Sequence, residues 1–205
     1  MQLAESTLVS RSVGRPRDAR IDGAILHATT ELLEEVGYQR LTFAAVASRA
    51  GTSPPAVYRR WPTKAHLVHE AVFPSTTQDV LPKADDLRAG LRSMLVSGVQ
   101  LLNQPAARAA VPGLLAELTA APETHADILG RFAGNEWGWL HDRIAQGIHD
   151  GEVRPEVRPD TLLDMISGSA FLASAVGPPD RIDERWIDEV IDLIVRGITP
   201  NIGQD

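Results

Sequence analysis

Cations, aromatic rings and hydroxyl groups gather in the segment TFAAVASRAGTSPPAVYRRWPTK, which spans residues 42–64. Arginine and lysine bind phosphate oxygens, and arginine can also pair with the edge of a guanine through two hydrogen bonds. Threonine and tyrosine hydroxyls donate to phosphates as well. These residue types therefore suit the recognition of a nucleic acid rather than the breaking of a covalent bond.

The same segment has the pattern of two short helices joined by a tight turn. Gly51 can take the left-handed conformation that ends the first helix and reverses the chain. Thr52-Ser53 then offers a side-chain cap, and Pro54-Pro55 follows where the first helical turn has no N–H to lose. We expect the second helix over about 54–61. This layout is typical of a helix-turn-helix, whose second helix enters the DNA major groove.

The charge is divided unevenly along the chain. The net charge is −7, yet residues 1–73 carry nine Lys+Arg against seven Asp+Glu, and the remainder carries eleven against twenty. Such asymmetry indicates separate roles for the two parts. The first third can meet phosphates, whereas the acidic remainder would repel DNA and is expected to face elsewhere.

Several classes of protein are excluded by composition and spacing. Cysteine is absent, which removes disulfides, thiolate metal sites and cysteine nucleophiles. His66 and His69 lack the HExxH spacing, and Ser167-Gly168-Ser169 lacks the GxSxG spacing. No apolar run reaches the roughly 18 residues of a membrane span, and no secretory signal is present. We expect a cytoplasmic protein that is not an enzyme and has no catalytic residue, metal, cofactor or membrane partner.

The periodicity predicts helices throughout. Apolar residues recur at spacings of three and four, and no segment alternates with a period of two. The first helix is expected from Asp18 to Val36, with Gly37 closing it. With the helix-turn-helix, an all-α fold of about nine helices results. The other helices are expected from Thr63 to Pro74, over 85–103, over 123–149 up to Asp150-Gly151, and over about 160–175 and 183–197, with a proline-punctuated region at 105–122.

Residues 74–85 are rich in proline and polar groups, which indicates a domain boundary. Three parts follow from it: a flexible basic N-terminal arm at 1–17, a three-helix helix-turn-helix DNA-binding domain at 18–73, and a larger helical regulatory and dimerisation domain at 74–205.

Residues 18–73 resemble the DNA-binding signature of the TetR family of bacterial transcriptional regulators. The matching features are Gly37-Tyr38, Thr42, Ala47, Ala50-Gly51, Val57-Tyr58, Trp61-Pro62-Thr63-Lys64 and Leu67. Residues 74–205 are similar only in kind, as an all-helical ligand-binding and dimerising domain. The resemblance implies a homodimeric repressor that a small-molecule ligand releases from a pseudo-palindromic operator. One departure is Pro54-Pro55, where the family more often has polar or small residues, and it shortens the list of side chains that could read bases.

The expected DNA contacts fall into three groups. Thr42, Tyr58 and Lys64 are predicted to bind phosphates, the last because a cation at the first turn of a helix is opposed by the helix dipole unless an anion is near. Arg59 and Arg60 are candidates for base or backbone contact, and the sequence does not say which does which. The residues expected nearest the groove are Ser53, Pro54, Pro55 and Ala56.

The N-terminal arm contains Gly14-Arg15-Pro16-Arg17, which resembles the core of an AT-hook. Arg15 and Arg17 are therefore expected to enter the minor groove of A·T-rich DNA. The alternative is a disordered basic tail that attracts DNA without specificity.

Two further sets of residues are predicted in the second domain, with ordinary core packing as the alternative for each. A ligand pocket could be lined by Met94, Phe132, Trp137, Trp139, His141 and Met165. The last two helices are expected to form the dimer interface, through Ile166, Ser169, Ala170, Ala173, Ile187, Val190, Ile191 and Ile194. A second hypothesis for the whole protein is an architectural protein that coats A·T-rich DNA non-specifically.

Overall fold

The structure, a computed structural model, describes residues 19–73, 86–123, 126, 128, 138–178 and 180–200. These residues form nine helices and no strand, which confirms the predicted all-α fold. The predicted arm and the proposed boundary at 74–85 lie outside the described residues. The helices are α1 (Ala19–Arg40), α2 (Phe43–Arg49), α3 (Pro54–Tyr58), α4 (Lys64–Val72), α5 (Leu87–Leu102), α6 (Pro105–Ala120), α8 (Gly138–His149), α9 (Pro159–Val176) and α10 (Glu184–Ile198).

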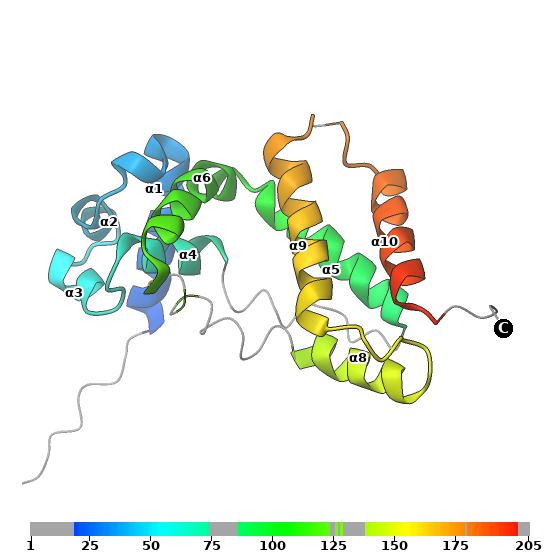
Figure 1. Ribbon diagram of the computed structural model, residues 1–205. Coiled ribbons are helices and arrows are strands. Elements are labelled where there is room, and N and C mark those ends of the chain that lie inside the picture. The colour runs from blue at the N-terminus through cyan, green and yellow to red at the C-terminus, as the bar shows by residue number, and fades with distance from the viewer. Residues whose placement is uncertain are drawn as a thin grey trace, which may run out of the picture.

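Helices α1 to α4 form a head at one end of the molecule (Figure 1). Gly37 has φ 73° and ψ 171°, a conformation open to glycine alone, and it interrupts α1 where the sequence predicts the end of that helix. Gly51, with φ 64°, makes the turn between α2 and α3. Thr42 and Thr63 cap α2 and α4, their side chains accepting from the backbone N–H of Ala45 and His66. Glycines and caps therefore end these helices where the sequence indicates.

Residues Pro105–Ala120 form one helix, α6, where the sequence predicts a region interrupted by prolines at 105–122. Pro105 lies in the first helical turn, where its missing N–H costs nothing. Pro112 lies inside the helix and removes the hydrogen bond to the carbonyl of Arg108. Burial offsets that loss, since one stripe of α6 is apolar and packed: Ala106, Ala107, Ala110, Leu114 and Leu118.

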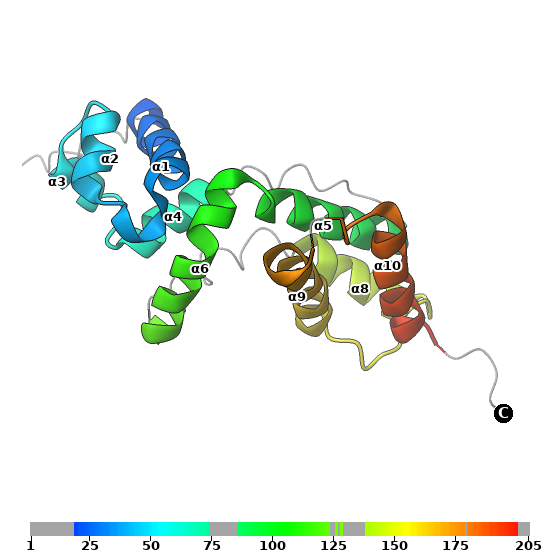
Figure 2. The ribbon, with the colours of Figure 1, turned by 90° about the horizontal axis from the view of Figure 1, so that it is seen from above.

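The apolar side chains form two separate cores. One core joins α1 to α4 with the apolar stripe of α6, so α6 packs on the head although it follows α5 in the chain. Figure 2 shows α6 lying between the head and the remaining helices. The other core joins α5 with α8, α9 and α10. We call the helices around this second core the body.

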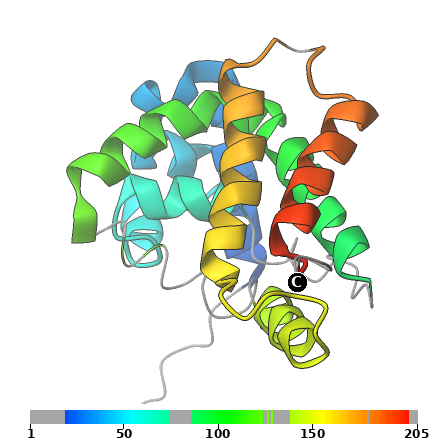
Figure 3. The ribbon, with the colours of Figure 1, turned by 45° about the vertical axis from the view of Figure 1, so that its right-hand side comes forward.

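Within the body, α9 and α10 stand beside each other and both pack on α5, with α8 across their lower end (Figure 3). The two helices agree with the predicted ranges of about 160–175 and 183–197. The long helix predicted over 123–149 is described as α8 only from Gly138, because most of 124–137 lies outside the described residues. None of the described helices is both long and apolar enough to cross a membrane.

Candidate nucleic-acid interface

Helix α3, the second helix of the predicted helix-turn-helix, presents its first turn to the outside. Ser53, Pro54 and Pro55 are exposed and Ala56 is half-buried, while Val57 is fully buried and anchors the helix to the head. Ser53 occupies the cap position, but the predicted capping hydrogen bond from its side chain does not form. Since the proline rings have no N–H, the surface offered by this turn is apolar apart from the Ser53 hydroxyl.

Two hydroxyl-bearing residues lie beside the start of α2. Thr42 is exposed, and its Oγ1 accepts from the backbone N–H of Ala45 at 3.2 Å. Tyr58, the last residue of α3, is 59 % exposed, and its ring centroid lies 4.4 Å from that of Phe43, the residue after Thr42. The Thr42 hydroxyl can still donate its own proton outward while it caps the helix. The two predicted phosphate contacts are thus neighbours on the surface of the head.

Lys64 begins α4 and is half-buried. Its Nζ donates to the carbonyl oxygen of Tyr38 at 3.2 Å and lies 4.3 Å from the centroid of the Tyr38 ring. The carbonyl and the negative face of the ring both attract the ammonium group, which the α4 dipole alone would disfavour. The ammonium group is therefore held at the N-terminus of α4 by protein groups.

Arg60 is tied into the head. Its guanidinium forms an ion pair with Asp22 of α1 and donates from Nη1 to the carbonyl of Ala56 at 3.0 Å. The Arg60 side chain is only 9 % exposed. Its donors are therefore used to join α1 and α3, which leaves little of this residue for DNA.

Arg59 has the opposite environment. It is exposed, and its side chain makes no hydrogen bond or ion pair with any residue that the structure describes. The sequence leaves open which of the two arginines faces DNA; the structure favours Arg59, whose five N–H donors are not used by the described part of the head.

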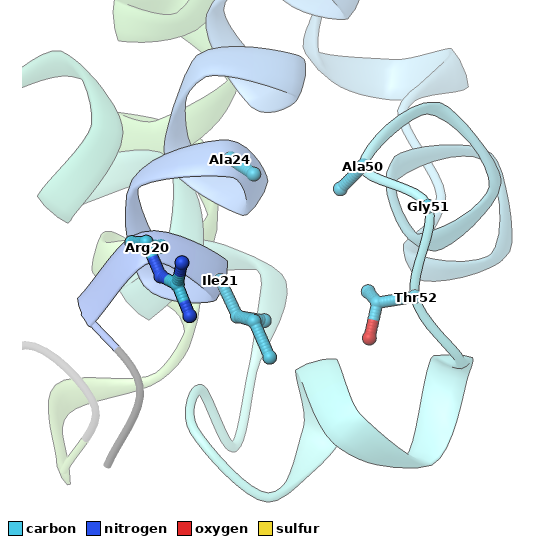
Figure 4. A pocket seen from close by; sticks show the side chains of 6 residues that line it. All are labelled: Arg20, Ile21, Ala24, Ala50, Gly51 and Thr52. Carbon is cyan, nitrogen blue, oxygen red and sulfur yellow. The ribbon is translucent and has the colours of Figure 1, made fainter.

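A hollow of about 300 Å³ separates the start of α1 from the helix-turn-helix turn. Figure 4 shows Arg20 and Ile21 reaching into it from α1, opposite Ala50, Gly51 and Thr52. Arg20 is exposed. It adds a cation next to the turn.

Two acidic residues that the sequence reasoning missed hold the head together. Asp22 binds Arg60, as described above. Glu117 of α6 accepts a hydrogen bond from the Tyr38 hydroxyl at 2.5 Å, and Tyr38 is only 4 % exposed. Burial, and next the hydrogen bond and charge of Glu117, raise the pKa of Tyr38 well above its usual range, so the phenol stays protonated. No sequence signal pairs Tyr38 with a residue 79 positions away.

The predicted ligand-pocket residues do not share one environment. Met94 is buried in the body core, and Trp139 packs against Gly90 of α5. His141 is exposed and pairs with Asp160 at 3.3 Å. Met165 is half-exposed and lines a groove of about 580 Å³ between α9 and α10. Phe132 and Trp137, like Arg15 and Arg17 of the arm, lie outside the described residues.

Six of the eight residues predicted for the dimer interface are buried within the chain itself. Ser169 and Val190 are half-buried, but the others are buried in the chain's own core: Ile166, Ala170, Ala173, Ile187, Ile191 and Ile194. Five of them belong to the body core and Ala173 is 4 % exposed, so these side chains offer little surface to a partner. The large apolar side chains that α9 and α10 leave exposed are Met165, Leu172, Val176 and Leu193.

Comparison with known proteins matches both parts of the chain to family models. Residues 25–71 match the model described as "Bacterial regulatory proteins, tetR family". Residues 81–194, more than half of the chain, match the model described as "Tetracyclin repressor-like, C-terminal domain".

Individual proteins of the same kind are similar along most of their length. An uncharacterized HTH-type transcriptional regulator of Mycobacterium tuberculosis is 29% identical over 182 residues, which cover 87% of this chain and 88% of the relative. The DNA-binding transcriptional repressor TetR of Mycobacteroides abscessus is 26% identical over 185 residues, covering 84% and 93%. The crystal structure of NalD, the secondary repressor of the MexAB-OprM multidrug efflux pump in Pseudomonas aeruginosa, has a TM-score of 0.56 at 22% identity and covers 90% of this chain and 98% of its own. This last likeness concerns the fold.

Proposed function

Because the chain belongs to the TetR family of bacterial transcriptional regulators, which bind DNA and are not enzymes, we propose that it is a homodimeric repressor released from a pseudo-palindromic operator by a small-molecule ligand. The observation that carries the proposal is the head surface formed by the first turn of α3, with exposed Thr42, Tyr58 and Arg59 around it. It combines a helix that fits the major groove with phosphate donors beside it.

The role of each residue at this surface follows from the exposure of its side chain and from its hydrogen-bond or ion-pair partners. Thr42 and Tyr58 position the head on the backbone, because their hydroxyls are exposed at the start of α2. Lys64 adds a charged contact at the N-terminus of α4. Arg59 is the candidate base reader, since Arg60 is held by Asp22. The prolines of α3 offer apolar contacts, for example to a thymine methyl.

A second copy of the chain is the expected partner of α9 and α10. Met165, Leu172 and Val176 recur at spacings of seven and four, which places them on one face of α9. Leu172, Val176 and Leu193 are 57, 75 and 73 % exposed. Met165 and Leu193 line the same groove, so the apolar surfaces of the two helices adjoin. A contiguous apolar surface of this kind is typical of an interface, and a two-fold dimer would place two heads on two half-sites.

Release by a ligand is supported by the family, whose regulators bind small-molecule effectors. A ligand can weaken operator binding only if it binds better to the conformation of the dimer whose heads do not fit the two half-sites. The chemical class of that ligand is best sought from the regulated genes.

Selection of bound fragments from the source genome with the purified full chain tests the repressor against the architectural alternative. We expect enrichment of a pseudo-palindrome whose half-sites lie about one or two helical turns apart, with binding that survives an excess of random DNA. Enrichment of A·T-rich fragments without a shared motif, and loss of binding to random competitor, would support the architectural protein instead. The genes that flank the selected fragments would then indicate which compounds to test as ligands.

A further inference from the structure

Tyr38 joins the head to α6 through its hydroxyl. The ring is 4 % exposed, and the hydroxyl donates to Oε2 of Glu117 at 2.5 Å. Glu117 lies on α6, inside the segment that matches the C-terminal family model, whereas Tyr38 lies inside the segment that matches the N-terminal one. A side chain of the regulatory part thus determines where the Tyr38 hydroxyl lies.

The same tyrosine holds Lys64 on its other side. Its carbonyl oxygen accepts from Lys64 Nζ at 3.2 Å, and its ring centroid lies 4.3 Å from that nitrogen. Both groups that attract the ammonium therefore belong to Tyr38. If the ring or the backbone of Tyr38 moved, the Lys64 ammonium would lose its place at the start of α4.

The Tyr38 ring packs closely against α6, which leaves little room for another orientation of the ring. A Cβ added at Gly113 of α6 would lie 2.5 Å from Cδ1 of the Tyr38 ring, so the helix backbone approaches the ring at a position without a side chain. Gly37, directly before Tyr38, has φ 73° and fixes the direction of the chain there. The ring is thus enclosed by α6 on one side and Lys64 on another.

We propose that Glu117 is a positioning residue for DNA binding, which acts through Tyr38 to hold the Lys64 ammonium where it meets a phosphate. This inference rests on the proposed function, because it requires Lys64 to contact the DNA backbone. Glu117 itself does not touch DNA in this scheme. It fixes Tyr38, and Tyr38 fixes the cation.

The direction in which Glu117→Ala changes the affinity for the operator distinguishes this positioning role from a general electrostatic effect. Removing a carboxylate from a DNA-binding protein ordinarily strengthens binding, because the repulsion of phosphates falls. Glu117→Ala should instead weaken operator binding roughly three- to tenfold, the scale of one hydrogen bond. Glu117→Gln keeps an acceptor oxygen for the Tyr38 hydroxyl and should bind at least as tightly as the wild type. Glu123→Ala, which removes an exposed acid just after α6, is the matched control and should not weaken binding.

Combining the Glu117 substitution with one at Lys64 tests whether Glu117 affects DNA binding through Lys64. Lys64→Ala should weaken binding to all sequences and lower the slope of log Kd against log salt by about one. In that background, Glu117→Ala should cause little further loss, and Tyr38→Phe should behave like Glu117→Ala in both backgrounds. Thermal unfolding and light scattering confirm that each variant is folded and has the mass of the wild type before its affinity is compared.

Each outcome decides a separate point. Losses from Glu117→Ala and Lys64→Ala that simply add, or a Glu117→Gln variant as weak as Glu117→Ala, would overturn the positioning role while leaving the repressor intact. A wild-type chain that shows no preference for any operator would instead overturn the proposed function, and Lys64→Ala without effect would remove Lys64 as a phosphate contact.

Discussion

Asp22 on α1 and Arg60 after α3 form an ion pair inside the head, in which their side chains are 20 and 9 % exposed. The pair joins the first helix of the chain to the end of the recognition helix. Arg60 also holds the carbonyl of Ala56, so the C-terminal end of α3 is fixed from two directions. The neighbouring Arg59 is exposed, and its side chain forms no such hydrogen bond or ion pair with the described residues.

Arg60→Ala should destabilise the head. The change leaves the carboxylate of Asp22 partly buried without its partner, and we expect a loss of about 1–3 kcal/mol in the free energy of unfolding. Urea denaturation followed by circular dichroism measures it. Arg59→Ala is the matched control and should stay within about 0.5 kcal/mol of the wild type. Equal stability of the two variants would show that the Asp22 pair contributes nothing.

Arg59→Ala should change the sequence preference of DNA binding. If Arg59 pairs with a base, the variant loses about 1–3 kcal/mol of discrimination at one position of the operator and binds the other positions as before. Affinities for the operator and for its single-base variants, measured at one salt concentration, test this. An equal loss on every sequence would assign Arg59 to a phosphate.

Leu172→Glu should dissociate the dimer. A carboxylate on the apolar face of α9 would be buried without a partner in the dimer but solvated in the monomer. Light scattering at micromolar concentration should give the monomer mass of 22.2 kDa, against twice that for the wild type. Leu115→Glu, at another exposed leucine on α6, is the control and should keep the mass of the dimer. A wild-type mass of one chain would contradict the interface.

The free energy of unfolding should decrease as the pH is lowered, because of the titration of His69. Burial, with a smaller contribution from the charge of His66, lowers the pKa of His69 from 6.5 to about 4. Between these values the unfolded chain binds a proton at this position that the folded chain does not, so the free energy of unfolding decreases as pH decreases from 6.5 to about 4. His69→Gln should lose less stability across that window than the wild type, as followed by denaturation at each pH. His27→Gln, at an exposed histidine of α1, should follow the wild type; a constant difference between wild type and His69→Gln would contradict the mechanism.

Gly37→Ala should be costly and Gly23→Ala should not, although both glycines lie in α1. Gly37 has φ 73° and ψ 171°, which a residue with a Cβ adopts only with strain of about 1–3 kcal/mol. Gly23 is exposed in ordinary helical conformation, and an added Cβ meets nothing within 4 Å. Alanine there should stabilise the helix by about 0.5–1 kcal/mol. Thermal melting of the two variants compares them directly.

Local signals in the sequence were sufficient for much of the head. The positive φ angles of Gly37 and Gly51 and the caps at Thr42 and Thr63 all occur where residue type predicts them, because turns and helix ends depend on a few adjacent residues. Two local expectations were wrong, and both concern a helix of only five residues: the side-chain cap at Ser53 does not form, and α3 ends at Tyr58 rather than near residue 61. Trp61, one of the family-like residues of the head, is fully buried, and its Nε1 donates to Glu70 of α4 at 2.7 Å.

The remaining differences arise from packing between distant segments. Prolines argue against a helix at 105–122, but the burial of the α6 stripe on the head outweighs Pro112. Helical spacing places Ile191 and Leu193 on opposite faces of α10, but only the structure shows that the face of Ile191 is fully buried on the chain's own core and that Leu193 is exposed. Arg59 and Arg60 are likewise indistinguishable in sequence, because Asp22 selects between them from 38 residues away.

The placement of α6 also decides how this regulator can be recombined with its relatives. A chimera that joins residues 1–73 to the regulatory helices of another family member would leave the head core facing a foreign α6. Such a graft would separate Tyr38 from both Gly113 and Glu117. The unit that can be exchanged intact is the head together with α6, which is interrupted in the chain by α5. Hybrid regulators built at the apparent sequence boundary therefore need matching α6 residues as well as a transplanted helix-turn-helix.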